Sequence, residues 1–579
     1  MKKNHELFNR DPRTANLAND GQARLVSESE NTRAAEMLRY ELEHFVCEGQ
    51  YAKGMQRILS SFLENLGSSA QRAAWVSGFY GSGKSHLLKM LCHLWVNTAF
   101  PDGATARSLA PDLTANILAD LKELDTAGRK SGGGLFAVSG TMPEGSSDSA
   151  RLTVLGIMFR SCGLPAAYNQ AMFCLYLKNK GFYDAVRKHL EDAGRDFARE
   201  LTDLYVSPYL RKALLAVDPG LGDEKEVRQL LRDQFPAKTD IDTSEFIRVT
   251  KEVLKSQGGG SLPLTIFVID EVQHYIGDDK DRSRHVTELA EALNKQMDSK
   301  VLLVMAGQNA LSTDTPQFAW LRDRFTIPVE LSDADVETVT RKVLLSKKPQ
   351  AVSLLDSTLD DCAGEIERQL AKSAIGPNNK DRDFLIPDYP ILPTRRRFWE
   401  VALRAVDPSG SSSLLRTQLR ITHEALRAVA DDPVGHTIPG DFMFFQQQTP
   451  LVQQGLLSRE ISDRILRLDD GSDRGRLMAR TCGLVFLIRK LPRERAVDTG
   501  VRATEEMLGD LLVEDLAMDG KKVRKELPDA LKDLVELGVL LFDGEEYNLQ
   551  TRESAEWDDK FRTELAKVRQ DSAAVSHER

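Results

Sequence analysis

Hydrophobic residues along the chain follow two kinds of spacing, and each kind predicts a different secondary structure. Over residues 30–66 they recur every three or four positions, as in helices buried along one face. Short continuous apolar runs predict β-strands at 73–77, 135–139, 264–269, 301–306 and 326–331. The run 264–269 is the most apolar, as expected for a parallel strand buried on both faces. Helical spacing separates these runs, for example over 285–298, so we predict a layered α/β fold with a parallel sheet.

Two long helical segments accompany the predicted sheet. Residues from about 152 to 258 show mostly helical spacing and lie between the second and third predicted strands, so we expect them to form a helical insertion. Strand signals largely disappear after residue 331. Helices are then predicted at 336–345, 354–372, 395–406 and 414–430, which is typical of a helical lid.

A different pattern occurs near the end of the chain. Helical spacing continues to Pro528, and a short helix is predicted over 529–537, ending at Gly538. Apolar runs at 539–542 and 547–549 flank Asp543-Gly544, which is a strong signal for a hairpin turn. Helices followed by one β-hairpin predict a winged-helix-like domain.

These patterns divide the chain into five parts, which suits 579 residues because one compact core cannot grow to that length. We predict an N-terminal helical lead-in at 1–70, an α/β core at 71–331 with its insertion at about 152–258, a helical lid at 332–450, a winged-helix-like domain at 451–555 and a charged tail at 556–579.

Composition narrows the class of protein. Hydrophobic residues make up 41% of the chain and charged residues 28%, as in ordinary globular proteins. The net charge of −10 argues against a chain that coats nucleic acid through a global basic field, so any DNA contact must be local. The six cysteines lack the spacing of a zinc site or a disulfide framework. Without a signal-like start or an apolar run of membrane-spanning length, we expect a cytoplasmic protein with no membrane partner.

One glycine-rich segment carries the clearest chemistry. It fits the pattern G-x-x-x-x-G-K-[ST] with Gly78, Phe79, Tyr80, Gly81, Ser82, Gly83, Lys84 and Ser85, followed by His86. Its glycines let backbone N–H groups turn toward a phosphate, and the helix that follows presents its N-terminal dipole. We expect Lys84 to reach the β- and γ-phosphates of ATP and Ser85 to bind Mg²⁺. The alternative is a glycine-rich turn with an incidental lysine.

An acidic pair follows the most apolar predicted strand. Asp270 and Glu271 stand at its carboxyl end, where a parallel sheet delivers ligand-binding residues. We expect Asp270 to hold Mg²⁺ and Glu271 to polarise the attacking water, which makes this the Walker B position. The alternative is a solvated helix cap.

Further candidates are weaker. Gln308, or else Asn309, follows the next strand and is expected at a sensor 1 position, against the alternative of a polar strand-end turn. Arg324, or else Arg322, is a candidate arginine finger that would act on a neighbouring subunit of a homo-oligomer; a surface ion pair is the alternative. In the lid, Arg416 and Arg420 share one helix face and are candidate sensor 2 contacts, with a solvated face as the alternative.

Two basic clusters are candidate phosphate contacts for DNA, although most such short runs are solvated surface. They are 395–397, which is three arginines, and 521–525, which holds three lysines and one arginine. The predicted hairpin turn carries Asp543, Glu545 and Glu546, whose charge would repel a phosphate backbone.

The glycine-rich segment also resembles a known family. Residues 75–91, from Trp75 through the loop to Leu87-Leu88-Lys89-Met90-Leu91, are similar to the BrxC/PglY ATPases of BREX phage-defence systems. The resemblance implies an AAA+-like, ORC-like P-loop NTPase that uses ATP and Mg²⁺ and acts with a DNA methyltransferase and a phosphatase-like protein. Members are usually considerably longer, so the resemblance leads us to expect that this chain is an N-terminal ATPase portion or a short variant.

Two other functions stay open at this point. One is a nucleotide-gated scaffold that assembles partners with little turnover. The other is a DNA-loading or transposition-type AAA+ ATPase outside BREX. Whether DNA is contacted directly or through partners is not decided by the residues.

Overall fold

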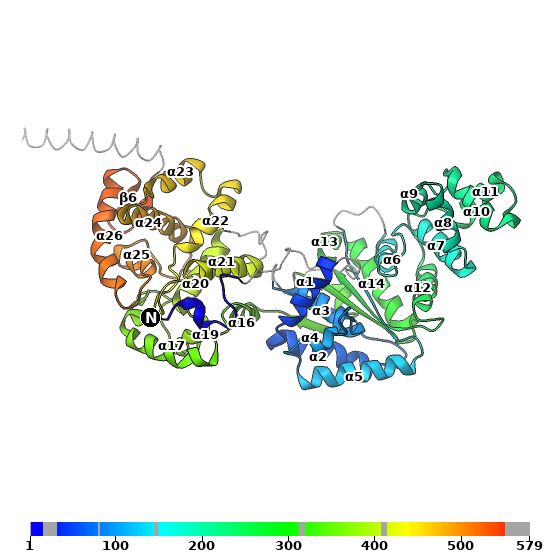
Figure 1. Ribbon diagram of the computed structural model, residues 1–579, viewed down its shortest axis with the longest axis horizontal. Helices are drawn as coiled ribbons and strands as arrows, with labels where there is room; N and C mark the ends of the chain where they lie inside the picture. The colour runs from blue at the N-terminus through cyan, green and yellow to red at the C-terminus, as the bar shows by residue number, and fades with distance from the viewer. Residues whose placement is uncertain are drawn as a thin grey trace, which may run out of the picture. The chain divides into compact units, whose positions relative to one another are not determined.

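The chain forms two compact units in a computed structural model that describes residues 2–14, 32–78, 82–143, 149–311, 319–406 and 414–550. The first, here called the sheet unit, spans Ala18–Thr338. The second, here called the helical unit, combines Met1–Leu17 with Val339–Arg579. Figure 1 labels the elements of both units, and each unit is described by itself.

The sheet unit is built on a five-stranded parallel sheet, as predicted from the apolar runs. Its strands are β1 (Ala74–Ser77), β2 (Leu135–Thr141), β3 (Leu264–Asp270), β4 (Val301–Gly307) and β5 (Ile327–Glu330). Their order in the sheet is β2-β3-β4-β1-β5, and every neighbouring pair is parallel. Strand β1 therefore lies between β4 and β5, the two strands of this sheet that come last in the sequence.

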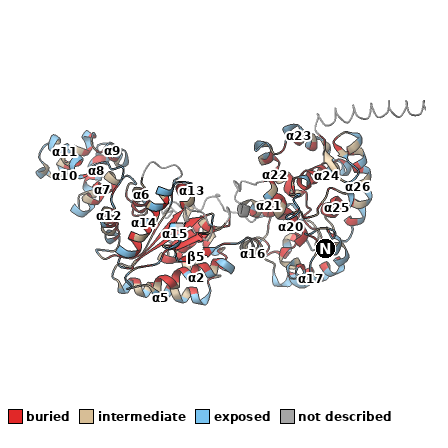
Figure 2. Cartoon of the chain, turned by 180° about the vertical axis from the view of Figure 1, so that it is seen from behind, coloured by how far each residue is buried: buried red, intermediate tan, exposed pale blue. Residues whose placement is uncertain are grey.

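Both faces of this sheet are covered, which explains the continuous apolar runs. Successive strand residues point to opposite faces, so Val268 packs with α2, α3 and α5, whereas Phe267 and Ile269 pack with α6, α12 and α14. Every residue of β3 and of β4 is buried. Figure 2 shows the buried strands as the red centre of this unit.

Several helices of the sheet unit begin after a residue whose side chain caps them, such as Thr114 before α5 and Asp242 before α12. Outside the segment between β2 and β3, the helices of this unit are α1 (Thr32–Glu43), α2 (Gly49–Glu64), α3 (Lys84–Val96), α4 (Ala106–Leu109), α5 (Ala115–Lys130), α13 (Val272–Ile276), α14 (Lys280–Gln296), α15 (Ala319–Arg322) and the start of α16 (Asp333–Val343).

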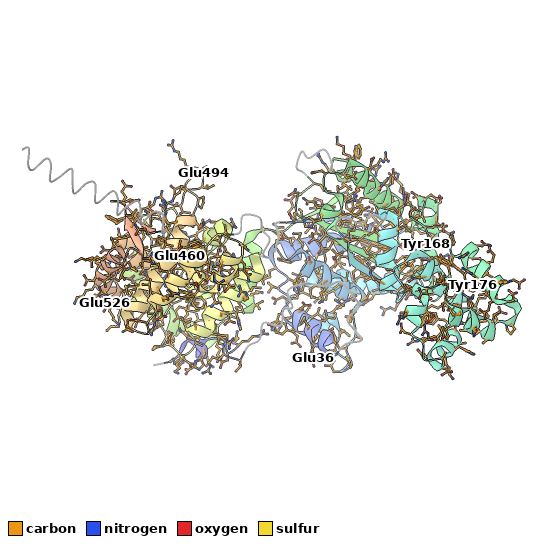
Figure 3. The ribbon with its side chains drawn as sticks, turned by 90° about the horizontal axis from the view of Figure 1, so that it is seen from above. Glu36, Tyr168, Tyr176, Glu460, Glu494 and Glu526 are labelled. Atoms are coloured by element: carbon orange, nitrogen blue, oxygen red, sulfur yellow. The ribbon has the colours of Figure 1, made fainter. Side chains whose placement is uncertain are left out.

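The segment between β2 and β3 is helical. It contains α6 (Ala150–Ser161), α7 (Tyr168–Lys180), α8 (Tyr183–Asp192), α9 (Phe197–Thr202), α10 (Pro208–Val217), η2 (Pro219–Leu221), α11 (Glu224–Gln234) and α12 (Thr243–Gln257). Helices α6 and α12 pack beside the sheet, and α7–α11 form a cluster beyond them (Figure 1). Tyr168 and Tyr176, labelled in Figure 3, belong to this cluster.

The helical unit has its own apolar core, which includes Leu7 and Phe8. Its elements are η1 (Asn4–Leu7), α17 (Pro349–Asp361), α18 (Ala363–Arg368), α19 (Asp381–Asp388), α20 (Pro393–Val406), α21 (Leu414–Ala428), α22 (Phe442–Gln453), α23 (Arg459–Leu468), α24 (Asp473–Lys490), α25 (Glu505–Leu512), α26 (Asp519–Glu536), β6 (Leu540–Phe542) and β7 (Tyr547–Leu549).

The predicted lead-in at 1–70 does not form one part of the structure. Residues 2–14 belong to the helical unit, whereas α1 and α2 belong to the sheet unit. Asn4 is buried there, and its side-chain Nδ2 donates to the carbonyls of Val429 and His436. The Tyr389 hydroxyl donates to Asn4 Oδ1 over 2.6 Å. These contacts are polar and distant in sequence, so hydrophobic spacing gave no sign of them.

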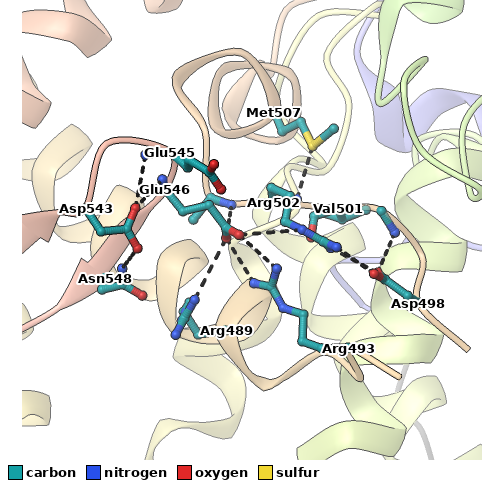
Figure 4. A network of polar contacts seen from close by, with 12 residues as sticks. Arg489, Arg493, Asp498, Val501, Arg502, Met507, Asp543, Glu545, Glu546 and Asn548 are labelled. Carbon is teal, nitrogen blue, oxygen red and sulfur yellow. Dashed lines mark hydrogen bonds and ion pairs between the residues drawn. The ribbon is translucent and has the colours of Figure 1, made fainter. Parts of the chain in front are cut away.

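Strands β6 and β7 form the predicted antiparallel hairpin. Asp543 shapes its turn by accepting hydrogen bonds from the backbone N–H of Glu545 and Glu546, at 3.1 and 2.8 Å. Three arginines, Arg489, Arg493 and Arg502, surround the Glu546 carboxylate (Figure 4). The charge of Glu546, one of the three acidic residues of this turn, is therefore balanced within the unit.

Two helix predictions were wrong in their boundaries. The lead-in helix is broken into α1 and α2 at residues 44–48. Near the end, Pro528 lies inside α26, where the sequence predicted a break. Leu527, Ala530, Leu531 and Leu534 are fully buried on either side of it, so tertiary packing keeps the helix continuous despite the missing N–H.

Residues 551–579, including the predicted tail, lie outside the described residues. Within the described ranges, every helix falls short of the length and apolar character needed to cross a membrane.

Candidate functional site

The carboxyl ends of β1, β3 and β4 meet at one edge of the sheet because all three strands are parallel. Ser77 at the end of β1 is paired with Gly307 at the end of β4, and Asp270 ends β3 one strand further along. In open α/β sheets, ligands bind outside the carboxyl ends of the strands, where the order of strands reverses. In this sheet the reversal falls at β1, since the chain reaches β4 on one side of it and β5 on the other.

The glycine-rich turn follows β1 directly. Gly78 N–H donates to the Gln308 carbonyl over 3.4 Å, which ties the start of the turn to the end of β4. Gly83 has φ +85°, a left-handed conformation that glycine adopts without strain, and α3 begins at the next residue. Phe79, Tyr80 and Gly81 lie outside the described residues.

Tyr51 on α2 contacts the backbone of the glycine-rich turn, and sequence reasoning missed this contact. Its buried hydroxyl donates to the Ser82 carbonyl over 2.5 Å. Because C=O and N–H of one peptide group point in opposite directions, this bond aims the Gly83 N–H away from Tyr51. A tyrosine within an amphipathic helix carries no motif that would have revealed this contact.

Lys84, Ser85 and Asp270 lie together at this edge. The Lys84 ammonium donates to the Gly78 carbonyl over 2.7 Å, and the Ser85 hydroxyl donates to Asp270 Oδ2 over 2.5 Å. Asp270 is only 4% exposed, and its Oδ1 accepts from the Glu271 N–H over 2.8 Å. Burial lowers the pKa of Lys84, whereas the charges of Asp270 and Glu271 act in the opposite direction.

These residues fit the phosphates of a nucleotide with Mg²⁺. Ser82 Oγ is buried and has no hydrogen-bond partner among the residues that the structure describes. A Cβ at Gly78 would stand 2.5 Å from Ser82 Oγ, so only glycine leaves the space above that hydroxyl open. A cation at Ser85 and Asp270 would take its other ligands from phosphate and water, as Mg²⁺ commonly does. Among the described residues, no group of three or more His, Cys, Asp or Glu side chains offers an alternative metal site.

Glu271 lies beside Asp270 in a left-handed backbone conformation, with φ +58°. Burial raises the pKa of its carboxyl group and the Asp270 charge adds to this, while His274 and Lys84 oppose the rise. Glu271 Oε2 lies 2.9 Å from Nδ1 of His274, and the other ring nitrogen of His274 lies 3.0 Å from Nε2 of Gln308. A carboxylate, an imidazole and an amide thus form one chain between the ends of β3 and β4.

Gln273 fixes the end of β4 in place. Its side-chain oxygen accepts hydrogen bonds from the backbone N–H groups of Gln308 and Asn309, at 2.7 and 2.8 Å. The Asn309 carbonyl accepts from the Trp75 indole over 3.0 Å. Of the two sensor 1 candidates, Gln308 has the side chain that contacts His274, while the Asn309 side chain is exposed. Sequence reasoning missed Gln273 and His274, although they lie only two and three residues after Glu271.

The candidate arginines lie in different surroundings. Arg324 forms an ion pair with Glu291 over 3.0 Å, and Arg322 is exposed at the end of α15. Arg420 is exposed on α21 of the helical unit, and the side chain of Arg416 lies outside what is described. His86 is half-buried with its ring against Phe45, and burial lowers its pKa.

The cluster 395–397 is not a solvated run or a DNA contact. Arg395 is fully buried and donates to Gln369, Thr437 and two backbone carbonyls. Arg397 is bound to Asp381 through two hydrogen bonds. In the cluster 521–525, Arg524 is paired with Glu365 and Asp510, and the three lysines are exposed. Of the described residues in these two clusters, the three exposed lysines stay candidates for phosphate contact, and one of them, Lys522, also pairs with Asp473 over 3.8 Å.

Comparisons with known proteins add little to this picture. No protein-family model matches the chain. Among solved structures, it is similar to the structure of Drosophila ORC bound to DNA, at 10% sequence identity, with 94% of each chain covered and a TM-score of 0.26. A TM-score this low carries no argument, so the interpretation of the site rests on the residues themselves.

Proposed function

We propose that this chain is a P-loop ATPase that binds ATP with Mg²⁺ at the edge formed by β1, β3 and β4. The hydrogen bond between Ser85 and Asp270 carries this proposal. These residues are 185 positions apart, yet their oxygens lie 2.5 Å apart beside the buried ammonium of Lys84. A hydroxyl, a carboxylate and a lysine next to a glycine-rich turn are the groups that hold a nucleotide's phosphates and its Mg²⁺.

Each residue has a distinct task in this proposal. When bound, Mg²⁺–ATP supplies the phosphoryl group and a cation that neutralises charge on its oxygens. Lys84 binds phosphate oxygens, which replace the Gly78 carbonyl as the hydrogen-bond partner of its ammonium group. Ser85 and Asp270 hold the cation. Glu271 takes a proton from water at its carboxylate, and Gln308 contacts the terminal phosphate.

Nucleotide binding tests this assignment directly. Lys84→Ala removes the lysine that the motif aims at the phosphates, so its Kd for Mg²⁺–ATP should rise at least about 10-fold, a loss of about 1.4 kcal/mol. Lys122→Ala, at an exposed lysine on α5, is the matched control and should bind as the wild type does. Calorimetric titration measures both. Equal affinity of the two variants would refute the site.

We further propose that the ATPase acts in a BREX phage-defence system, together with a DNA methyltransferase and a phosphatase-like protein. The support is the sequence of residues 75–91, which resembles the BrxC/PglY family. Phage plaque counts on cells that carry the chain with its neighbouring genes test this role, and Lys84→Ala should restore plaque formation. Absence of a methyltransferase gene and a phosphatase gene from the neighbourhood would contradict it.

A further inference from the structure

His274 lies between two residues to which the proposed function gives separate tasks. Its Nδ1 is 2.9 Å from the Glu271 carboxylate and its Nε2 is 3.0 Å from the Gln308 amide nitrogen. A carboxylate accepts and an amide N–H donates, so a neutral imidazole with its proton on Nδ1 satisfies both contacts. The ring therefore connects the acidic end of β3 to the polar end of β4 through its two nitrogens.

Gln308 is itself held on both sides through its backbone. Its N–H donates to Gln273 Oε1 over 2.7 Å, and its carbonyl accepts from the Gly78 N–H over 3.4 Å. The backbone of Gln308 is thus anchored between α13 and the glycine-rich turn. Its side-chain amide is the part left to exchange one partner for another. The carbonyl contact to Gly78 keeps the backbone of Gln308 beside the turn expected to hold the phosphates.

We propose that His274 is a positioning residue that links occupancy of the terminal phosphate site to the orientation of Glu271. The proposal rests on the proposed function. With the site lacking a third phosphate, Gln308 donates to His274, and His274 holds Glu271. A third phosphate takes the Gln308 amide as its donor, which releases His274 and lets the Glu271 carboxylate turn to water. Glu271 keeps its left-handed φ of +58° throughout, so only its side chain moves between the two arrangements.

Nucleotide selectivity follows from this exchange. Binding of Mg²⁺ with a non-hydrolysable ATP analogue breaks the contact between Gln308 and His274, whereas binding of Mg²⁺–ADP leaves it intact. His274→Ala removes the contact beforehand, so the analogue should bind about 2- to 12-fold more tightly, the range of one net hydrogen bond. Affinity for Mg²⁺–ADP should stay unchanged. His189→Ala, at an exposed histidine on α8, is the matched control and should change neither affinity.

A second measurement observes the ring itself. In protein labelled with ¹⁵N-histidine, the His274 signals are identified by their loss in His274→Ala. The ATP analogue should shift these signals and Mg²⁺–ADP should not, and in Gln308→Ala neither nucleotide should shift them. Equal shifts with both nucleotides, or a selective shift that persists in Gln308→Ala, would overturn the link.

The two proposals fail in different ways. If the analogue binds but His274→Ala leaves its affinity unchanged, or improves ADP binding equally, the link through His274 is wrong and the ATP site stands. If calorimetry detects no nucleotide binding to the wild-type chain, both the proposed function and the proposed link through His274 are refuted.

Discussion

Gly83→Ala is a sharp test of how the glycine-rich turn is held. Gly83 has φ +85°, and for alanine a left-handed backbone costs about 1–2 kcal/mol. The new Cβ would also stand 2.1 Å from the Tyr51 hydroxyl, which must move and give up its bond to the Ser82 carbonyl. That bond contributes about 1 kcal/mol. Together, the substitution should destabilise this region by about 2–3 kcal/mol.

Tyr51→Phe separates these two contributions. Without the hydroxyl, the nearest ring atom lies 3.1 Å from the new Cβ, so Gly83→Ala should then cost only about the 1–2 kcal/mol of backbone strain. Hydrogen exchange of peptides covering α3 measures the opening free energy in the wild type, both single variants and the double variant. The two substitutions should differ from additivity by about 1 kcal/mol. If the free-energy costs of the two single substitutions add to that of the double variant within about 0.5 kcal/mol, the inferred role of Tyr51 in holding the turn is refuted.

Three further predictions concern catalysis, assembly and acid stability. Glu271→Gln should bind ATP normally but hydrolyse it at least about 100-fold more slowly in a phosphate-release assay, because the amide cannot accept the proton; a loss of binding would exclude Glu271 as the base. Arg324→Ala should keep ATP affinity and lose turnover, and mixing it with Glu271→Gln should restore turnover in an oligomer detected by light scattering. A constant monomer with turnover independent of dilution would leave Arg324 as the ion-pair partner of Glu291. Arg248 lowers the pKa of Glu245 to about 2, so the stability this carboxylate contributes is present above about pH 4.5 and is lost as the pH falls toward 2. Glu245→Gln should remove that component from thermal melts compared at pH 6 and pH 3, and an unchanged pH dependence would contradict it.

Much of the sheet could be predicted because burial on both faces leaves a local signature. The runs that became β3 and β4 are apolar at nearly every position, whatever lies around them in the fold. Parallel strands bring Asp270 at the end of β3 to the same edge as the glycine-rich turn after β1, and the motif places Ser85 at the end of that turn, so strand direction and motif together indicated that these residues meet.

The residues that support the site could not be predicted in the same way. Tyr51 and Gln273 act through single hydrogen bonds to backbone atoms of other elements, and such contacts leave no periodic trace. Arg395 was misjudged for a related reason. Its partners, Gln369, Thr437, Ile438 and Asp510, are spread over 142 positions of the chain, from 369 to 510, and only the fold shows that they converge on one guanidinium.

The division of the helical unit between two separate stretches of sequence has a consequence for synthesis on the ribosome. Residues 2–14 emerge before the sheet unit, but their partners near Val429 and His436 follow only after the whole of Ala18–Thr338. At about 5–20 residues per second, that intervening unit of roughly 320 residues takes about 15–65 s to make. The sheet unit can fold during this interval, whereas Leu7 and Phe8 stay exposed to chaperones until the later helices arrive to bury them.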